Sequence, residues 1–198
     1  MTNNEVRVKM LSPIILEGNK IKLDQLLLSF DKTPVIQKTN DLYHASHGFA
    51  VGVKSSGLFT VADNIDALSL PCHPEKPTSI DTRSGVWQTY KRKVRYHVID
   101  ELVFYAQADA DYLESMLRNI GFLGAYSAIG FGEIADVCIT QTPRDYSFAK
   151  DGVLMRSIPV GVDLDVDLGD SRLLASSFHQ GLDDCYNNNN LVLSYTPN

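Results

Sequence analysis

Two successive β-α-β patterns predict an α+β fold for this chain of 198 residues. Each pattern consists of a strand, a helix and a second strand, at 5–10, 22–30 and 48–53 and again at 102–106, 109–120 and 134–139. Two such units in series are typical of a ferredoxin-like fold, in which two helices cover one face of an antiparallel sheet. A glycine-rich loop at 121–132 and a long inserted segment complete the predicted architecture.

The first unit follows from two periodicities. Residues 5–10 alternate apolar and polar side chains, which is typical of a half-buried strand. The helix at 22–30 has an apolar face formed by Leu23, Leu26, Leu27 and Phe30. We therefore expect the helix to lie against the sheet along that face.

The segment between the units contains strands and one irregular stretch. Strands are expected at 48–53 and 58–61, with a turn at 54–57 between them. Residues 62–85 are rich in Asp, Pro and Ser and lack periodicity, which predicts an exposed insertion of a kind that is often functional. A long strand is expected at 86–99.

The second unit has the clearer helix. It carries acidic residues in its first turn, where the helix dipole favours them, and an apolar face formed by Leu113, Met116, Leu117 and Ile120. Beyond Thr140 the pattern is less regular, with strands expected at 153–160 and 191–195. We assign 1–140 to one domain with an insertion around 62–100, and 141–198 to a C-terminal extension that packs on it.

The composition argues against several classes of protein. A net charge of −6 is unlike that of a generic nucleic-acid binder, although it allows a local basic patch. No apolar run is long enough for a membrane helix, and the first residues lack the apolar core of a signal peptide. Cys72, Cys138 and Cys185 are widely spaced and odd in number, as expected of reduced, buried thiols in a cytoplasmic protein.

The histidines give little support to a metal site. His44 and His47 have a spacing that can ligate zinc on a helix, but no second ligand pair accompanies them. Cys72 and His73 are adjacent, in an expected loop between two prolines. We therefore expect neither a metal nor another cofactor.

The loop at 121–132 holds four glycines between a helix and a strand. Such a loop can direct several backbone N–H groups at one anion, because glycine accepts positive φ and allows close approach. It lacks the Gly-Lys-Ser/Thr of a P-loop, and it follows a helix, whereas a dinucleotide fingerprint precedes one. The structural alternative is a helix C-cap at Gly121 and a tight turn at Gly130 and Gly132.

A basic stripe at 90–97 departs from the acidic trend of the chain. In a strand, Lys91, Lys93, Arg95 and His97 share one face, and Tyr90, Arg92, Val94, Tyr96 and Val98 share the other. Basic side chains track phosphates, and interleaved aromatic rings stack on unpaired bases, which favours RNA. The alternative is a solvated strand face whose charge prevents edge pairing.

These residues together resemble a known family. A strand and helix at 103–121 that run into a Gly-Phe-Gly motif at 130–132 resemble the RAMP superfamily of CRISPR-associated proteins. The chain is most similar to the Cas-five-like (Csf-three) subunits of type IV CRISPR–Cas complexes, with further likeness at 23–27, 43–46 and 156–160. The resemblance covers roughly residues 5–160, and the glycine loop is its most specific motif.

The resemblance implies a non-catalytic subunit of a ribonucleoprotein that defends against viruses or plasmids. Such a subunit caps the 5′ handle of the CRISPR guide RNA and joins Cas-seven-like backbone subunits to a large subunit. The candidate RNA-binding residues are Gly121, Gly124, Ala125, Tyr126, Ser127, Gly130, Gly132, Lys91, Arg92, Lys93, Arg95, His44, Ser46 and His47. The chain departs from RAMP glycine loops in having no basic residue between Asn119 and Glu133.

Two other functions remain open at the level of the sequence. Some RAMP relatives are metal-independent endoribonucleases that process CRISPR RNA, and His44, His47, Tyr43 or Tyr126 would then supply the acid–base groups. No convincing triad is present, so no catalytic residue is assigned. The third possibility is a ferredoxin-like module that binds a small molecule or a protein.

Overall fold

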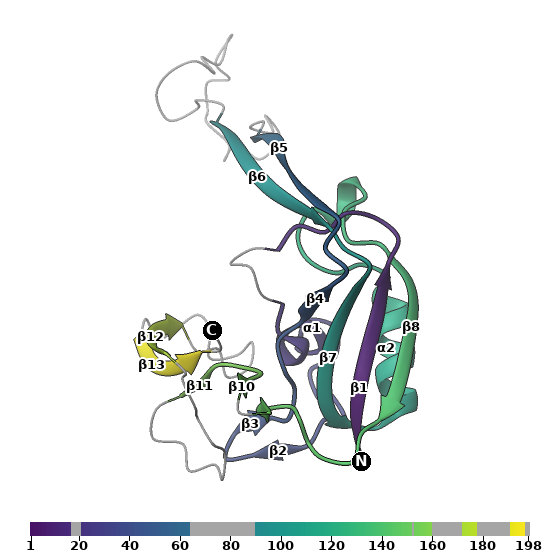
Figure 1. The fold of residues 1–198 in the computed structure, drawn as a ribbon, viewed down its shortest axis with the longest axis vertical. Helices are drawn as coiled ribbons and strands as arrows, with labels where there is room; N and C mark the ends of the chain where they lie inside the picture. The colour runs from purple at the N-terminus through teal and green to yellow at the C-terminus, as the bar shows by residue number, and fades with distance from the viewer. Residues whose placement is uncertain (17–20, 64–89, 152, 160–171, 178–190, 197–198) are drawn as a thin grey trace, which may run out of the picture.

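A computed structural model describes residues 1–16, 21–63, 90–151, 153–159, 172–177 and 191–196. A four-stranded sheet and two helices form its centre, and a two-stranded hairpin projects from one end of the sheet (Figure 1). Mixed strands and helices of this kind make an α+β fold, as predicted. No helix among the described residues has the length and apolarity needed to cross a membrane.

The central sheet has the order β4-β7-β1-β8, and every neighbouring pair is antiparallel. Its strands are β1 (Thr2–Met10), β4 (Phe49–Val51), β7 (Glu101–Ala108) and β8 (Ile134–Gln141). The alternation in β1 is confirmed, since Val6 and Val8 are fully buried while Arg7 is exposed. β1 thus lies between two strands that follow it much later in the chain.

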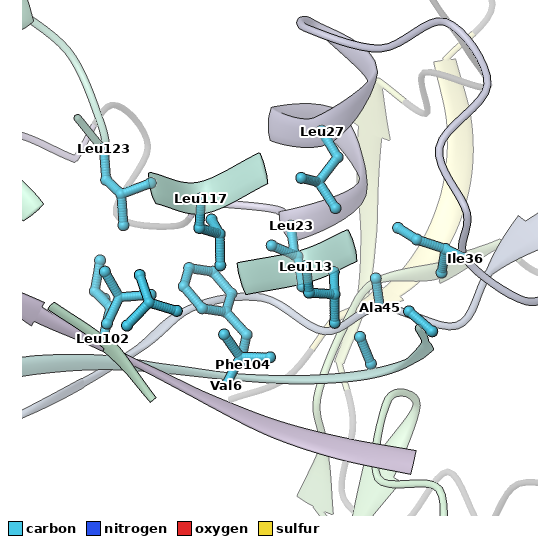
Figure 2. Close-up of a cluster of buried hydrophobic side chains, with 14 of the residues drawn as sticks. Val6, Leu23, Leu27, Ile36, Ala45, Leu102, Phe104, Leu113, Leu117 and Leu123 are labelled. Atoms are coloured by element: carbon cyan, nitrogen blue, oxygen red, sulfur yellow. The ribbon is translucent and has the colours of Figure 1, made fainter. Parts of the chain in front are cut away.

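Helices α1 (Leu23–Leu28) and α2 (Ala110–Ile120) pack on the same face of this sheet. Leu23 and Leu27 from α1 meet Leu113 and Leu117 from α2 above Phe104 of β7 (Figure 2). These side chains are all fully buried. The apolar stripes of two helices and the inner face of the sheet therefore form one core.

The two helices differ in how well their ends were predicted. In α2, Asp109 accepts a hydrogen bond from the backbone N–H of Tyr112, and Gly121 ends the helix with φ 70°. α1 is shorter than the predicted 22–30 and has no side-chain N-cap. Since α1 ends at Leu28, Phe30 does not lie on its buried face and is 62% exposed.

The hairpin consists of β5 (Ser55–Asp63) and β6 (Tyr90–Val98), paired antiparallel over nine residues each. The predicted turn at 54–57 is wrong, because Ser55–Gly57 already belongs to β5. The chain instead bends at Gly52, whose φ of +66° and close approach to Asp100 exclude a side chain. The expected irregular insertion lies, from residue 64 on, outside the described residues.

Short strand pairs complete the described structure. β2 (Lys38–Thr39) pairs with β3 (Leu42–Tyr43), and β9 (Ala149–Lys150) pairs with β10 (Val153–Leu154). The strand predicted at 153–160 is divided into β10 and β11 (Ile158–Pro159). A further three-stranded sheet has the order β11-β13-β12, where β12 is Arg172–Ser177 and β13 is Leu191–Thr196.

The outer edge of β8 is partly covered by a side chain of α2. Arg118 pairs with Asp136 at 2.9 Å and donates to the carbonyl oxygen of Val137 at 3.3 Å. Arg118 also pairs with Glu114 one turn earlier in the helix. A charged side chain over a strand edge hinders pairing with another strand.

Candidate nucleic-acid interface

The structure brings the basic stripe and the glycine-rich loop together. Phe131 of the loop lies 5.3 Å from the ring of Phe59 in β5 and 6.0 Å from the ring of Tyr96 in β6, measured between ring centroids. Both separations are in the range of favourable tilted aromatic pairs. The base of the hairpin is therefore docked on the loop between α2 and β8 (Figure 1).

Residues 13–15, which precede α1, form backbone hydrogen bonds with both the hairpin and the glycine-rich loop. Ile14 exchanges two backbone hydrogen bonds with His97 of β6, each 2.8 Å long. Beside it, the carbonyl oxygen of Ile15 accepts from Ala125 of the loop, and that of Pro13 accepts from Gly132. One short stretch of chain thus ties the hairpin and the loop to each other.

The loop uses most of its backbone N–H groups within its own chain. Its donors and their carbonyl acceptors are Leu123 to Gly132, Ala125 to Ile15, Ile129 to Tyr126, Gly130 to Ser127 and Gly132 to Pro13. Glu133 N–H donates to the Ser12 hydroxyl at 2.8 Å. These groups are therefore already satisfied, and the consecutive N–H groups of Tyr126, Ser127 and Ala128, which are not among the donors, are the ones left for the expected contact with an anion.

The four glycines fall into two kinds. A Cβ on Gly124 would lie 2.4 Å from the carbonyl oxygen of Ile15, and one on Gly132 would lie 1.8 Å from that of Leu123. A Cβ on Gly121 or Gly130 would meet no atom within 4 Å, although both have positive φ. Gly124 and Gly132 thus permit close backbone packing inside the protein, whereas Gly121 and Gly130 are favoured only because their φ is positive.

The positive charge near the loop comes from the hairpin. Arg92 of β6 places its guanidinium carbon 5.6 Å from the ring centroid of Tyr126, within the range of a cation–π contact. Tyr126 holds a left-handed conformation with φ 65°, which is uncommon for a residue with a side chain. Ser127, which follows it, is exposed.

The opposite face of β6 carries further exposed cations. Lys93 lies across from Thr60, and Arg95 lies across from Leu58, which is 60% exposed. Lys91 occupies the next position of the same alternation, opposite Ala62. The predicted alternation of the basic stripe is therefore consistent with the register of the hairpin.

His44, Ser46 and His47 lie elsewhere, beside the other end of β7. Ser46 exchanges hydrogen bonds with the backbone of Tyr105, and the Gln107 N–H donates to the carbonyl oxygen of His44. Ser46 is fully buried, and His47 is 3% exposed. The structure therefore separates these three candidates from the hairpin and the loop.

The His44 ring takes part in a chain of polar contacts. Nδ1 lies 2.5 Å from the Asp145 carboxylate, and Nε2 lies 2.8 Å from the hydroxyl of Thr39. Burial alone would raise the pKa of Asp145, but hydrogen bonds from His44 and Ser147 hold that pKa below its usual value. Phe148 packs edge-on against the His44 ring at 4.7 Å.

Arg156 forms a second polar cluster nearby, which the sequence did not reveal. Its guanidinium pairs with Asp24 of α1 at 3.0 Å, and both side chains are almost fully buried. It also donates to the backbone carbonyl oxygens of Tyr43 and Ala45. The segment around Arg156 is thereby fastened to α1 and to the stretch that contains His44.

On the face of the sheet opposite the helices, the side chain of Tyr105 is covered by other side chains. Tyr105 of β7 is 7% exposed, because Tyr146 packs against its ring and Met155 lies in the same cluster. Lys150 donates a hydrogen bond to the Tyr105 hydroxyl. On β1, the neighbouring Arg7 is paired with Glu5 and Glu101.

The polar side chains of the described residues do not gather into a metal centre. No group of three or more His, Cys, Asp or Glu side chains lies close enough there to hold an ion. His44 contacts one carboxylate and one hydroxyl. Cys72, His73 and Cys185 lie outside the described residues, and Cys138, which was expected to be buried, is exposed.

Comparison with known proteins identifies the family. A family model described as CRISPR type IV associated protein Csf3 matches residues 31–170, a range that includes the hairpin strands and the glycine-rich loop. No curated protein matches the chain. The resemblance to a type IV CRISPR subunit is thus confirmed over most of the chain's length, and the chain belongs to the family of CRISPR type IV associated protein Csf3.

Proposed function

We propose that this protein is a non-catalytic, guide-RNA-binding subunit of a type IV CRISPR ribonucleoprotein. In this role it caps the 5′ handle of the guide and joins Cas-seven-like backbone subunits to the large subunit. Membership of the Csf3 family supports the setting. The remainder of the proposal rests on the geometry of the hairpin and the loop.

The strand order supports a ferredoxin-like core of the RAMP type. Taken in chain order, β1, β4, β7 and β8 are the four strands of two β-α-β units, and they lie in the order β4-β7-β1-β8. Two helices on one face and an antiparallel sheet are the features of that fold. The hairpin is then an insertion between its second and third strands.

The observation that carries the proposal is the docking of a cationic hairpin on the glycine-rich loop. Arg92, Lys93 and Arg95 are all exposed on β6, which belongs to the hairpin that projects beyond the sheet (Figure 1). Arginine and lysine on a projecting strand match the spaced phosphates of a single strand. By contrast, Tyr105 on the helix-free face of the sheet is covered by Tyr146 and Met155.

The acidic body of the protein explains why we place this function within an assembly. A net charge of −6 repels RNA at long range, and screening at physiological salt limits attraction by the hairpin to about 8–10 Å. Neighbouring subunits that extend the basic path would raise the effective concentration of the guide at the hairpin. We therefore expect weak binding by the isolated chain and stable binding in the complex.

The test uses the chain co-expressed with its neighbouring subunits and a CRISPR array. The double variant Lys93→Gln/Arg95→Gln should lower guide affinity and flatten its salt dependence by about 0.7 for each phosphate that the hairpin no longer binds. Lys32→Gln/Lys38→Gln removes the same charge outside the hairpin and serves as the matched control. Equal effects of the two double variants would contradict a binding role for the hairpin.

The same complex tests where the guide is held. Binding at the 5′ handle predicts that the subunit protects the 5′ end of the guide from exonuclease, and that protection weakens in the hairpin variant. Protection confined to the 3′ end would contradict the cap. A complex that assembles without RNA contacts to this subunit would favour a module for protein interaction.

One observation favours a second candidate function, cleavage of guide precursors. The contact from Asp145 to Nδ1 of His44 would leave Nε2 as the proton acceptor, as a general base requires, once a substrate hydroxyl displaces the Thr39 hydroxyl that lies 2.8 Å from it. Purified protein incubated with repeat RNA in EDTA gives the test. Specific cleavage that His44→Ala abolishes would establish the endoribonuclease, whereas intact RNA after hours supports the binder.

A further inference from the structure

Several strand edges in the described part of the chain carry a feature that hinders pairing with another strand. On the central sheet, β4 has only three residues, and Arg118 covers part of the outer edge of β8. On the hairpin, Ile14 pairs with His97 at the base of β6, and exposed cations follow at Arg95 and Lys93. Short edge strands, charged side chains and covered edges are the usual means by which proteins avoid edge-to-edge association.

The outer edge of β5 has none of these features. The stretch from Ser55 to Ala62 contains no charged side chain and no proline. Leu58, in the middle of the strand, is 60% exposed, and Thr60 is exposed as well. Within the described residues, the only strand that pairs with β5 is β6. An uncharged edge of a nine-residue strand is therefore open to pairing with a further strand.

The register of the hairpin shows which backbone groups of β5 are directed outward. His97 uses both its N–H and its carbonyl oxygen to pair with Ile14, so neither group takes part in the β5–β6 ladder. Opposite residues of an antiparallel pair alternate between hydrogen-bonded and non-hydrogen-bonded positions. Ser56, which lies opposite His97, is therefore in a non-hydrogen-bonded pair, and so are Leu58 and Thr60. The N–H and carbonyl groups of these three residues face the outer edge.

A second copy of the same strand fits this edge. When two β5 strands pair antiparallel about a two-fold axis at Leu58, each Leu58 lies opposite its counterpart, and each Ser56 lies opposite Thr60 of the other copy. Serine–threonine pairs are favourable cross-strand neighbours, and the two leucines bury apolar surface. Pairing of β6 with its own copy would instead place Lys93 and Arg95 beside like charges.

The charges of the molecule favour the same arrangement. The hairpin projects from one end of the sheet, and its β6 strand carries the exposed cations Arg92, Lys93 and Arg95 (Figure 1). Antiparallel pairing directs the two hairpins in opposite senses, so the outer part of each comes beside the base of the other. The chain as a whole has a net charge of −6, so a cationic hairpin is attracted to the body of the second copy.

We propose that β5 is a dimerisation edge, through which two copies of this chain form one antiparallel sheet in the order β6-β5-β5-β6. The interface is isologous, since the same residues meet on both sides. A sheet of four strands is also more stable than a two-stranded hairpin alone. The inference goes beyond guide binding, because it uses the strand of the hairpin that lacks the basic stripe. Both β6 strands lie outermost in the dimer, so their cations remain accessible.

Sedimentation of the purified full chain over a wide range of concentrations tests the dimer. We expect a monomer–dimer equilibrium for the unaltered protein. Leu58→Lys places two cations against each other on the two-fold axis and should weaken dimerisation by more than about tenfold. Leu11→Lys is the matched control, because Leu11 is 65% exposed and lies outside the hairpin. This control should dimerise as the unaltered protein does.

A second pair of variants tests the backbone edge without adding charge. The N–H group of Thr60 faces outward, so Thr60→Pro removes a donor of the edge and leaves the β5–β6 ladder in place. We expect Thr60→Pro to lose the dimer, whereas Thr60→Ala keeps the N–H group and should retain it. Circular dichroism and a thermal melt show whether each variant remains folded.

Amide hydrogen exchange measured by NMR locates the contact. The N–H groups of Gly57 and Phe59 are directed at β6 and should be protected at every protein concentration. Those of Leu58 and Thr60 should become protected only as the dimer forms. This alternation is specific to strand pairing at the β5 edge, and association through another surface would not produce it.

A chain that stays monomeric at every concentration would overturn the proposal, as would a dimer that Leu58→Lys and Thr60→Pro leave intact. Protection of Leu58 and Thr60 that appears only in the assembled complex would show that a strand of a neighbouring subunit occupies the edge, which also overturns it. Guide binding is measured separately on that complex. Thr60→Pro should leave guide affinity unchanged, so the dimer and the proposed function can fail independently.

Discussion

Two regions of this molecule differ in whether their charged side chains are exposed to solvent or packed against partners. At the hairpin end, which comprises the β5–β6 hairpin and the loop at 121–132, Arg92, Lys93 and Arg95 are exposed beside a loop that is hydrogen-bonded to residues 13–15. In the clamp region, which comprises residues 39–47, 142–151 and 153–157, Arg156 is buried against Asp24 of α1 and His44 is half-buried against Asp145. The difference indicates that polar residues hold the fold together in the clamp region and face solvent at the hairpin end.

The comparison predicts that stability depends on Arg156 more than on any exposed cation. Arg156→Met leaves Asp24 buried without its partner, and loss of one member of a buried pair costs about 3–5 kcal/mol. Arg118→Met, which breaks an exposed pair on α2, should cost less than about 1 kcal/mol. Urea unfolding of both variants measures the difference, and similar losses would contradict the division into two regions.

The glycine-rich loop allows a second test, which measures how much stability depends on the close backbone packing at each of its glycines. Gly132→Ala places a Cβ 1.8 Å from the carbonyl oxygen of Leu123 and should cost about 2–4 kcal/mol. Gly124→Ala, with a 2.4 Å approach to Ile15, should also destabilise the protein. Gly130→Ala meets open space and should cost only the strain of its φ, about 1–2 kcal/mol.

Thermal melts with matched circular dichroism rank these three variants. We expect the order of stability to be Gly130→Ala above Gly124→Ala above Gly132→Ala. A Gly124 variant that folds as well as the Gly130 variant would show that the backbone near Ile15 yields easily. The loop would then be less rigid than its internal hydrogen bonds suggest.

Prediction from the sequence succeeded where local signals agreed. In α2, the apolar spacing of Leu113 and Leu117, the acidic residues of the first turn and the glycine at 121 all indicate the same helix, and the structure has it. The β2–β3 pair was missed, although Asn40 and Asp41, both with positive φ, are residues that two-residue hairpin turns favour.

The polar contacts of the clamp region could not be read from local patterns. Asp145 meets His44 across 101 positions of chain, and Arg156 meets Asp24 across 132. Contacts at such separations have no period in the sequence and depend on the completed fold. The turn predicted at 54–57 is wrong for a similar reason. Gly57 lies so close to the ring of Tyr96 on the neighbouring strand that a Cβ would clash with it, so this glycine reflects a contact between strands and not a turn.

The clamp region should be more sensitive to acid than the hairpin end. The folded-state pKa of Asp145 is lowered, so its stabilising effect is fully present above the ordinary carboxyl pKa of about 4. That effect is lost as pH falls through the lower folded pKa. Asp145→Asn should cost about 1 kcal/mol at neutral pH and should reduce the acid sensitivity of unfolding.

The exposed Asp151 provides the control for this charge change. Asp151→Asn removes the same charge from an exposed position of the same region and should leave the pH dependence of unfolding almost as it was. Unfolding free energies measured from neutral pH down to acid give both profiles. Parallel profiles for the two variants would mean that the contact between Asp145 and His44 contributes little.

The smallest effect on stability is expected at the hairpin itself. Lys93→Gln/Arg95→Gln alters exposed side chains and should change the unfolding free energy by no more than about 0.5 kcal/mol. Its effect on guide binding would then not be a consequence of misfolding. A large loss of stability would show that these cations also support the fold.

The place of β1 in the sheet has a consequence for how the chain is made. Val6 and Val8 pair on one side with Phe104 and Leu102 of β7, and on the other with residues of β8, which is completed only at Gln141. During synthesis the central strand therefore remains unpaired on both edges until most of the chain has left the ribosome. Open strand edges favour pairing between molecules, so chains that stop before β8 should aggregate as they emerge.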